Sequence, residues 1–158
     1  MSTPKKQEPA AEIRKLTPVL PDNLFVARTP DKGRAVFTSR PIKNGETIEV
    51  APMIVFDAKD REAINDTFLY EYYFEWGKKG KKGALALGFG SLYNHSYAPN
   101  AQYLPDFDLN VLEFRAVRNI EPGEEITVNY NLDPDDQTPV WWEQEKHKKK
   151  QKKKRQHP

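Results

Sequence analysis

The sequence contains no cysteine and no long hydrophobic run, and these two absences narrow what the protein can be. Without cysteine there can be no disulfide and no zinc site built on thiolates. No apolar stretch approaches the ~20 residues that a membrane-spanning helix needs. The first residues, MSTPKK, lack the apolar core of a secretion signal. We therefore expect an intracellular protein, cytoplasmic or nuclear, that makes no membrane contact.

Charge is unevenly distributed along the 158 residues. Residues 146–158 carry eight Lys or Arg and no acid, whereas residues 1–145 hold 17 basic and 23 acidic side chains. An acidic body concentrates cations near any cleft and so suits a positively charged peptide or ligand. A solvated acidic surface without such a role explains the charge equally well, so charge alone leaves both interpretations open.

The pattern of apolar segments predicts a mostly β domain. Short runs rich in Val, Ile and aromatic residues alternate with Gly, Pro and Asn turns, and helical periodicity is scarce. A short helix is expected at residues 60–65, and another starts at Pro139 with Thr138 as its N-cap. Strands are expected at residues 24–27, 35–38, 47–56, 70–76, 102–104, 111–117 and 125–130.

Composition divides the chain into four parts. A polar, proline-bearing stretch precedes the first strand, and a lysine-rich stretch of low complexity follows the last helix. We expect a flexible arm at residues 1–20, the globular domain at 21–131, a flanking segment with its helix at 132–146, and a basic disordered tail at 147–158.

Three segments carry a specific signature. Residues 32–37 read KGRAVF, residues 94–100 read NHSYAPN, and residues 123–130 read GEEITVNY. In this order and spacing they resemble a SET domain, and the resemblance extends from about residue 24 to residue 130. It implies several short β-sheets closed by a C-terminal pseudoknot. It also implies methyl transfer from S-adenosylmethionine to the ε-amine of a lysine in a protein substrate, without a metal.

Lysine methylation sets the chemistry that such a site must provide. Only the neutral amine attacks the methyl group, and with a reference pKa of about 10.4 its deprotonation at pH 7 costs about 4–5 kcal/mol. An aromatic channel lowers that cost by disfavouring the ammonium. The resemblance assigns the catalytic position to Tyr130, whose hydroxyl would lie beside the amine and the methyl group. Without the resemblance, Tyr130 is a strand-end tyrosine at the rim of the domain.

The resemblance also assigns cofactor binding to residues from several segments. Trp141 is the expected partner of the adenine ring, while Trp142 packs the helix onto the body, and these two roles could exchange. Two positions depart from the family: Ala35 stands where glycine is usual, and Tyr97 where many relatives have a zinc-ligating cysteine. The expected cofactor residues are Lys32, Gly33, Arg34, Ala35, Tyr72, Asn94, His95, Tyr130 and Trp141.

The expected lysine channel consists of Tyr72, Phe74, Tyr93 and Tyr130. For Tyr72, Phe74 and Tyr93 individually, packing in the core is at least as good an interpretation. The basic run that begins at Lys146 and ends at Arg155 could contact nucleic acid, act as an import signal, be methylated by the enzyme itself, or only keep the chain soluble.

Two functional hypotheses remain after the motifs are weighed. The first is an active lysine methyltransferase. The second is a non-catalytic SET-type module that binds basic peptides, or nucleic acid through its tail. A serine hydrolase is disfavoured, because Ser91 and Ser96 lack a G-x-S-x-G elbow around them.

Overall fold

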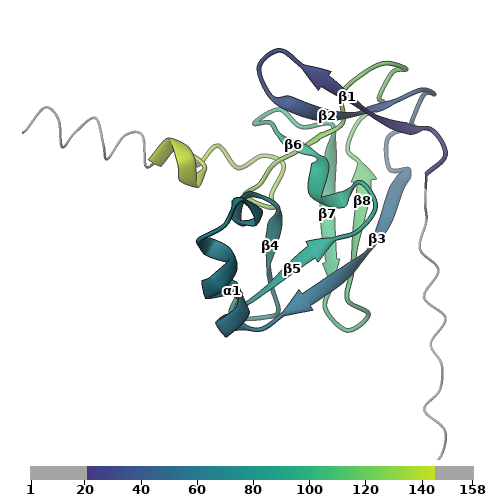
Figure 1. The fold of residues 1–158 in the computed structure, drawn as a ribbon. Helices are drawn as coiled ribbons and strands as arrows, with labels where there is room; N and C mark the ends of the chain where they lie inside the picture. The colour runs from purple at the N-terminus through teal and green to yellow at the C-terminus, as the bar shows by residue number, and fades with distance from the viewer. Residues whose placement is uncertain (1–20, 145–158) are drawn as a thin grey trace, which may run out of the picture.

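The computed structural model describes residues 21–144, and its mostly β architecture confirms the predicted fold class (Figure 1). A five-stranded antiparallel sheet has the order β4-β5-β3-β8-β7, and the β1-β2 hairpin lies over one end of it. The strands are β1 (Leu24–Thr29), β2 (Gly33–Thr38), β3 (Thr47–Phe56), β4 (Tyr73–Trp76), β5 (Lys82–Ala86), β6 (Asn94–His95), β7 (Ala101–Asp106), β8 (Val111–Ala116) and β9 (Thr127–Val128).

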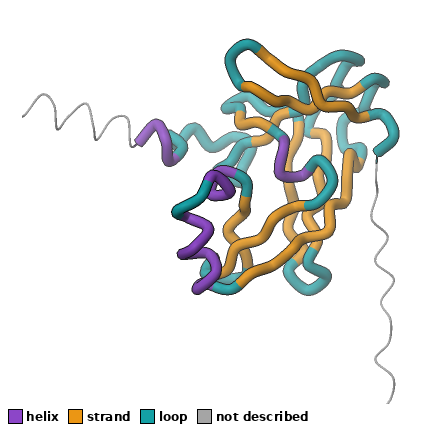
Figure 2. The backbone as a smooth tube through the Cα atoms, viewed as in Figure 1, coloured by secondary structure: helices purple, strands orange, loops and turns teal. Residues whose placement is uncertain are grey.

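Helical structure is limited to short pieces among residues 21–144 (Figure 2). They are α1 (Ala58–Asn65), the 3₁₀ turns η1 (Phe68–Glu71) and η2 (Gly90–Leu92), and a turn that begins at residue 141 and is described as far as 144. None of them is long and apolar enough to span a bilayer. The predicted N-terminal arm and basic tail lie outside the described residues.

Three predicted boundaries are wrong. Residues 70 and 71 of the expected 70–76 strand belong to η1, because the Thr67 hydroxyl accepts from the Leu69 N–H (3.2 Å) and stabilises a turn. Of the expected 125–130 strand, only Thr127–Val128 forms a regular strand, because its partner β6 is two residues long, and Glu125 forms an isolated bridge with Phe37. The last helix starts two residues late, with the Val140 carbonyl accepting from the Gln144 N–H (3.1 Å).

Two turns with the same I-x-x-G-E pattern pair with each other across the domain. Ile42 and Ile120 exchange both main-chain hydrogen bonds, each 2.9 Å long. Within each turn the glutamate side chain accepts from a main-chain N–H three residues earlier, at 3.0 Å for both Glu46 and Glu124. The related sequences therefore build related turns, and their pairing holds the segment before β3 against the segment before β9.

A pseudoknot brings the C-terminal segment to the Asn-His motif. The short strands β6 and β9 pair in parallel, with Asn94 opposite Thr127 and His95 opposite Val128. Asn100 fixes the crossing: its amide donates to the Glu125 carbonyl (2.7 Å) and its oxygen accepts from the Thr127 N–H (2.8 Å). Because β9 ends two residues before Tyr130, this pairing positions Tyr130 beside the motif.

The chain approaches the core closely just before the Asn-His motif. Gly90 is buried, and a Cβ there would lie 2.6 Å from the Ala86 Cβ and 3.1 Å from the ring of Phe114. Only glycine permits so close a contact. The η2 turn is therefore held against the sheet, which fixes the position at which the following residues, Tyr93 and Asn94, begin.

Candidate active site

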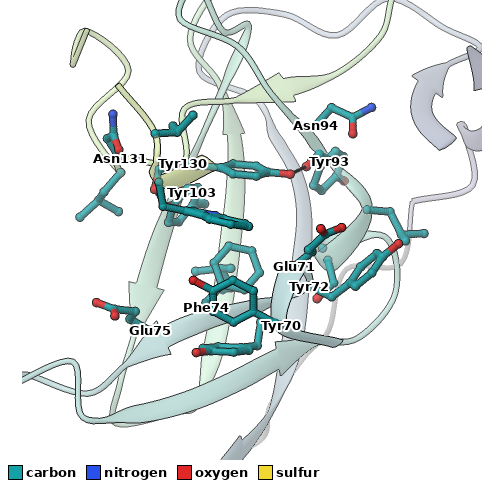
Figure 3. A pocket seen from close by; sticks show the side chains of 18 of the residues that line it. Tyr70, Glu71, Tyr72, Phe74, Glu75, Tyr93, Asn94, Tyr103, Tyr130 and Asn131 are labelled. Atoms are coloured by element: carbon teal, nitrogen blue, oxygen red, sulfur yellow. Dashed lines mark hydrogen bonds between the residues drawn. The ribbon is translucent and has the colours of Figure 1, made fainter. Parts of the chain in front are cut away.

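A cavity of about 890 Å³ lies between η1, β4, the segment that follows η2, and the C-terminal flank (Figure 3). Aromatic rings form much of its wall, with charged side chains at its edges. Eight of the residues predicted from the sequence line it: Lys32, Arg34, Tyr72, Phe74, Tyr93, Asn94, Tyr130 and Trp141. Gly33, Ala35 and His95 do not; Ala35 is a fully buried residue of β2, paired with Ala27.

Tyr130 is held by its main chain and by its hydroxyl. The hydroxyl donates to the Tyr93 main-chain carbonyl (2.8 Å), and the Tyr130 N–H donates to His95 Nδ1 (3.1 Å). Its own carbonyl accepts from the Tyr103 hydroxyl (3.1 Å). Burial in the cavity, together with the nearby Tyr72 and Glu71, raises the pKa of the Tyr130 hydroxyl to about 12. The phenol therefore stays protonated and oriented at neutral pH.

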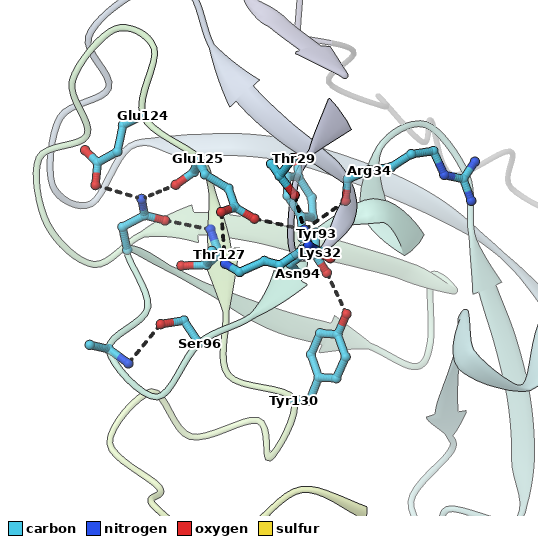
Figure 4. A network of polar contacts seen from close by, with 12 residues as sticks. Thr29, Lys32, Arg34, Tyr93, Asn94, Ser96, Glu124, Glu125, Thr127 and Tyr130 are labelled. Atoms are coloured by element: carbon cyan, nitrogen blue, oxygen red, sulfur yellow. Dashed lines mark hydrogen bonds and ion pairs between the residues drawn. The ribbon is translucent and has the colours of Figure 1, made fainter. Parts of the chain in front are cut away.

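Asn94 joins two segments that are far apart in the sequence (Figure 4). Its amide donates to the Arg34 carbonyl (2.9 Å) and to Glu125 Oε1 (2.9 Å). The other oxygen of Glu125 forms an ion pair with Lys32 Nζ (2.9 Å). One asparagine and one carboxylate thus fix the β1-β2 turn against the strand that leads to Tyr130.

His95 stands behind Tyr130 rather than in the cavity wall. Because its Nδ1 accepts a hydrogen bond, the proton of the neutral ring is assigned to Nε2, which is buried and has no partner among the described residues. Burial lowers the pKa of His95 below its ordinary value of 6.5. The ring packs edge-on against Tyr97 and Trp142, at centroid distances of 4.4 and 5.7 Å. His95 is therefore a neutral supporting group.

The predicted channel residues reach the cavity in different ways. Tyr72 follows η1, and Arg34 both donates to its hydroxyl (2.8 Å) and lies 5.6 Å from its ring centre. Phe74 lies on β4 against Tyr103, with centroids 5.3 Å apart. Tyr93 turns its hydroxyl into the core, so its main-chain carbonyl is the group that meets Tyr130.

The C-terminal flank is fastened to the body through Tyr97. The Tyr97 hydroxyl donates to Glu143 (2.7 Å) and accepts from the Val140 N–H (3.0 Å), and its carbonyl accepts from Gln137 (2.9 Å). Tyr97 thus ties down the flank by hydrogen bonds. Among residues 21–144, no cluster of three or more acidic or histidine side chains is arranged to hold a metal.

The two tryptophans of the flank, Trp141 and Trp142, pack against different tyrosines. Trp141 packs edge-on against Tyr70, at a centroid distance of 4.9 Å, and is 38% exposed. Trp142 packs against Tyr130 (5.8 Å) and also lines the cavity. Both rings are therefore available to a bound ligand, and the assignment of the adenine contact to Trp141 stays a prediction.

Sequence reasoning missed several residues of the site. Glu71 lines the cavity and forms no hydrogen bond or ion pair with another described residue, whereas the lining carboxylate of Glu75 is paired with Arg61 (2.5 Å). Tyr103 and Glu125 were also missed. Glu71 is an acid inside the aromatic run at residues 70–74, and Glu125 lies in the 123–130 segment, but neither pattern assigns the glutamate a role. Tyr103 becomes a site residue only through tertiary contacts.

Comparison with known proteins decides the family. The family model described as SET domain matches residues 33–131, which is more than half of the chain. The chain belongs to the SET domain family. A histone-lysine N-methyltransferase of Schizosaccharomyces pombe, specific for lysine 37 of histone H3, is 36% identical to this SET protein over 114 residues, 72% of this chain and 76% of the relative.

A solved structure agrees with this assignment. The crystal structure of a candidate histone methyltransferase from Plasmodium falciparum is 28% identical and has a TM-score of 0.55. The match covers 76% of this SET chain and 96% of the other. The family and the curated relative confirm the predicted enzyme class: this SET protein is a protein-lysine N-methyltransferase. They support the catalytic hypothesis over the non-catalytic binding module.

Proposed function

We propose that this enzyme uses S-adenosylmethionine to methylate a lysine of a basic nuclear protein, with Tyr130 as its catalytic residue. The observation that carries the proposal is the hydrogen bond from the Tyr130 hydroxyl to the Tyr93 carbonyl at the wall of the cavity. Asn94, which follows Tyr93 directly, ties this point to the β1-β2 turn. The cavity therefore combines an oriented tyrosine hydroxyl, an aromatic wall and polar side chains at its edge.

The residues present fit S-adenosylmethionine. A cavity of about 890 Å³ falls within the ~300–1,000 Å³ typical of small-molecule sites. Aromatic faces and the Glu71 carboxylate favour a positively charged ligand. When bound, the cofactor supplies an electrophilic methyl group on a sulfonium. The proposed holding groups that line the cavity are Lys32, Arg34, Asn94, Tyr130 and the rings of Tyr72 and Trp141. Gly33, Ala35 and His95, which do not line it, are proposed to support their chain neighbours there.

Tyr130 acts by orientation in this proposal. Because its proton is donated to the Tyr93 carbonyl, the lone pairs of its oxygen remain free to accept contacts from the cavity. With a pKa of about 12 it does not serve as a base near neutral pH. The rings of Tyr72, Phe74 and Tyr130 exclude water and disfavour the ammonium, so that more of the lysine is neutral there.

The charge of the body favours a basic substrate. Residues 1–145 carry six more acidic than basic side chains, and the yeast relative acts on histone H3. We accordingly place the enzyme inside the cell, in the nucleus. The nucleic-acid contact of residues 146–155 stays a prediction, because these residues lie outside those described.

The direct test offers the purified chain methyl-labelled S-adenosylmethionine and a mixture of core histones. We expect label on lysine side chains, identified by mass spectrometry of the digested histones. Label on arginine or histidine would contradict the proposed reaction. If the chain binds the cofactor but transfers no methyl group to the histones, the proposed substrate class is wrong.

The rate should rise with pH between 7 and 9.5. Neutral lysine increases up to about tenfold per pH unit below its pKa. Burial raises the pKa of Tyr103 to about 12, as it does for Tyr130, so both phenols remain protonated throughout this range. Single-turnover rates at saturating peptide provide the measurement. A flat profile would show that amine deprotonation does not limit the transfer.

Glu71→Gln should weaken use of a basic peptide and shift the pH profile. Figure 3 shows Glu71 on the side of the cavity toward which the Tyr130 hydroxyl points. An unpaired carboxylate there stabilises the incoming ammonium, so its neutralisation should lower kcat/KM about three- to tenfold and move the rise in rate to lower pH. The control is Glu62→Gln, an exposed acid of α1 away from the cavity. Identical profiles for wild type and Glu71→Gln would exclude this role.

A further inference from the structure

A fully buried carboxylate lies in the core behind the active site. Glu49, on β3, has no exposed surface and no ion pair with another described residue. Burial raises the pKa of its carboxyl above the ordinary 4.5, although its hydrogen bonds act in the opposite direction. A buried carboxylate without a cation is costly, and an apolar side chain of similar volume is often as stable or more so. A contribution to stability is therefore a weak explanation for a glutamate at this position.

The two oxygens of Glu49 bind the two ends of one short segment. Oε1 accepts from the Phe89 N–H (2.9 Å), and Oε2 accepts from the Tyr93 hydroxyl (2.8 Å). Between these ends runs η2, with Gly90 packed against Ala86 and Phe114. The Tyr93 ring also rests on Phe114, with centroids 4.5 Å apart. The segment is thus pinned at its start and at its end by a single side chain.

The segment of residues 89–93 ends at Tyr93, whose main-chain carbonyl accepts the hydrogen bond of Tyr130 at the cavity. The Tyr93 carbonyl receives the Tyr130 hydroxyl (2.8 Å), and Asn94 follows at once. We propose that Glu49 is a positioning residue for methyl transfer, which clamps residues 89–93 so that the Tyr93 carbonyl holds the Tyr130 hydroxyl in its reactive orientation. The inference rests on the role of Tyr130 proposed above, and Glu49 itself touches neither substrate nor cofactor.

The test replaces the clamp without emptying the core. Glu49→Met fills the space but removes both hydrogen bonds. Glu49→Gln can still contact both partners, because its amide oxygen can accept from the Phe89 N–H and its amide nitrogen can donate to the Tyr93 oxygen, which reverses the direction of the second bond. Ile48→Val, in the same strand and equally buried in the core, controls for general loosening. We expect kcat to fall about 10- to 100-fold in Glu49→Met, as for a misplaced catalytic group, and to stay within about threefold of wild type in the other two.

Two further measurements separate positioning from damage. Amide exchange of residues 89–95 in the free chain, followed by NMR, should be about tenfold faster in Glu49→Met only. The fall in kcat should largely disappear when Glu49→Met is combined with Tyr130→Phe, since the two changes act through one hydrogen bond. Unchanged exchange and kcat in Glu49→Met would overturn the proposal, as would an undiminished effect in the Tyr130→Phe background.

If Glu49→Met does not melt cooperatively, Tyr93→Phe decides the question. It removes one end of the clamp and keeps the ring against Phe114. A fall in kcat of about fivefold or more, with KM for the cofactor nearly unchanged, supports the clamp, and an unchanged kcat refutes it. Should Tyr130→Phe itself prove fully active, the proposed role of Tyr130 fails, while the exchange measurement still reports on the clamp.

Discussion

Tyr130→Phe is expected to slow methyl transfer by about 10²- to 10³-fold, the usual cost of removing one preorganised polar group from a reaction centre. The substitution removes the hydroxyl that bonds the Tyr93 carbonyl at the cavity wall. It leaves the main-chain bonds to His95 and Tyr103 intact, so the segment should keep its place. Single-turnover methyl transfer to a lysine peptide measures the effect, and cofactor affinity should change little.

The matched control for this variant is Tyr73→Phe. The Tyr73 hydroxyl bonds Asn65 and Arg61, between α1 and the β4-β5 hairpin, rather than a group beside Tyr130. Both variants lose one phenolic oxygen, and both should have a melting temperature close to that of the wild type. Near-normal turnover by Tyr130→Phe, or an equal loss in the two variants, would remove Tyr130 from the catalytic role.

Asn94→Ala is expected to abolish most of the affinity for S-adenosylmethionine. The side chain makes two hydrogen bonds, one to the Arg34 carbonyl and one to the Glu125 carboxylate, and so joins the turn to the strand before Tyr130. The hydrogen bond to the charged Glu125 contributes about 1.5–3 kcal/mol to holding the proposed site in its binding geometry, so its loss should weaken cofactor binding by at most roughly 10- to 100-fold. Isothermal titration calorimetry, with and without a histone peptide, provides the measurement.

Asn44→Ala serves as the control for this second variant. Asn44 is exposed in the turn before β3, and its main-chain N–H rather than its side chain makes the contact to Asn119. Its cofactor affinity should match that of the wild type. Two results would argue against the proposed cofactor site: equal affinity in Asn94→Ala, or no binding by the intact chain even when the peptide is present.

The sequence predicted those parts of the site that depend on local motifs. The turn at Lys32, the Asn94-His95 pair and Tyr130 were found from three short segments, and the structure brings them together through β6 and β9. Their roles follow from the family resemblance and await the variants above. The boundaries of β3 were also predicted correctly, because most of its ten residues are β-branched or otherwise apolar and form a strong local signal.

The remaining features are set by tertiary contacts and left no local signal. A two-residue parallel pair is too short to produce a periodic pattern, so the strand around residue 127 was predicted too long. From the sequence, Glu49 is only a single acid within an apolar strand, and its role becomes visible through its contacts with Phe89 and Tyr93. The same holds for Tyr103, whose hydroxyl meets the main chain of Tyr130 across 27 residues of sequence.

The pairing of β6 with β9 also bears on the order in which the molecule folds. The site is closed by contacts between distant parts of the chain, among them the Lys32–Glu125 pair, which spans 93 residues. Such contacts have a high contact order, and the loops that they close must lose entropy before the contacts form. During synthesis on the ribosome, the five-stranded sheet can form before residue 127 emerges, but the catalytic site cannot. If Tyr130 is the catalytic residue proposed above, activity reports that folding is complete, and we expect a nascent chain stalled before β9 to be inert.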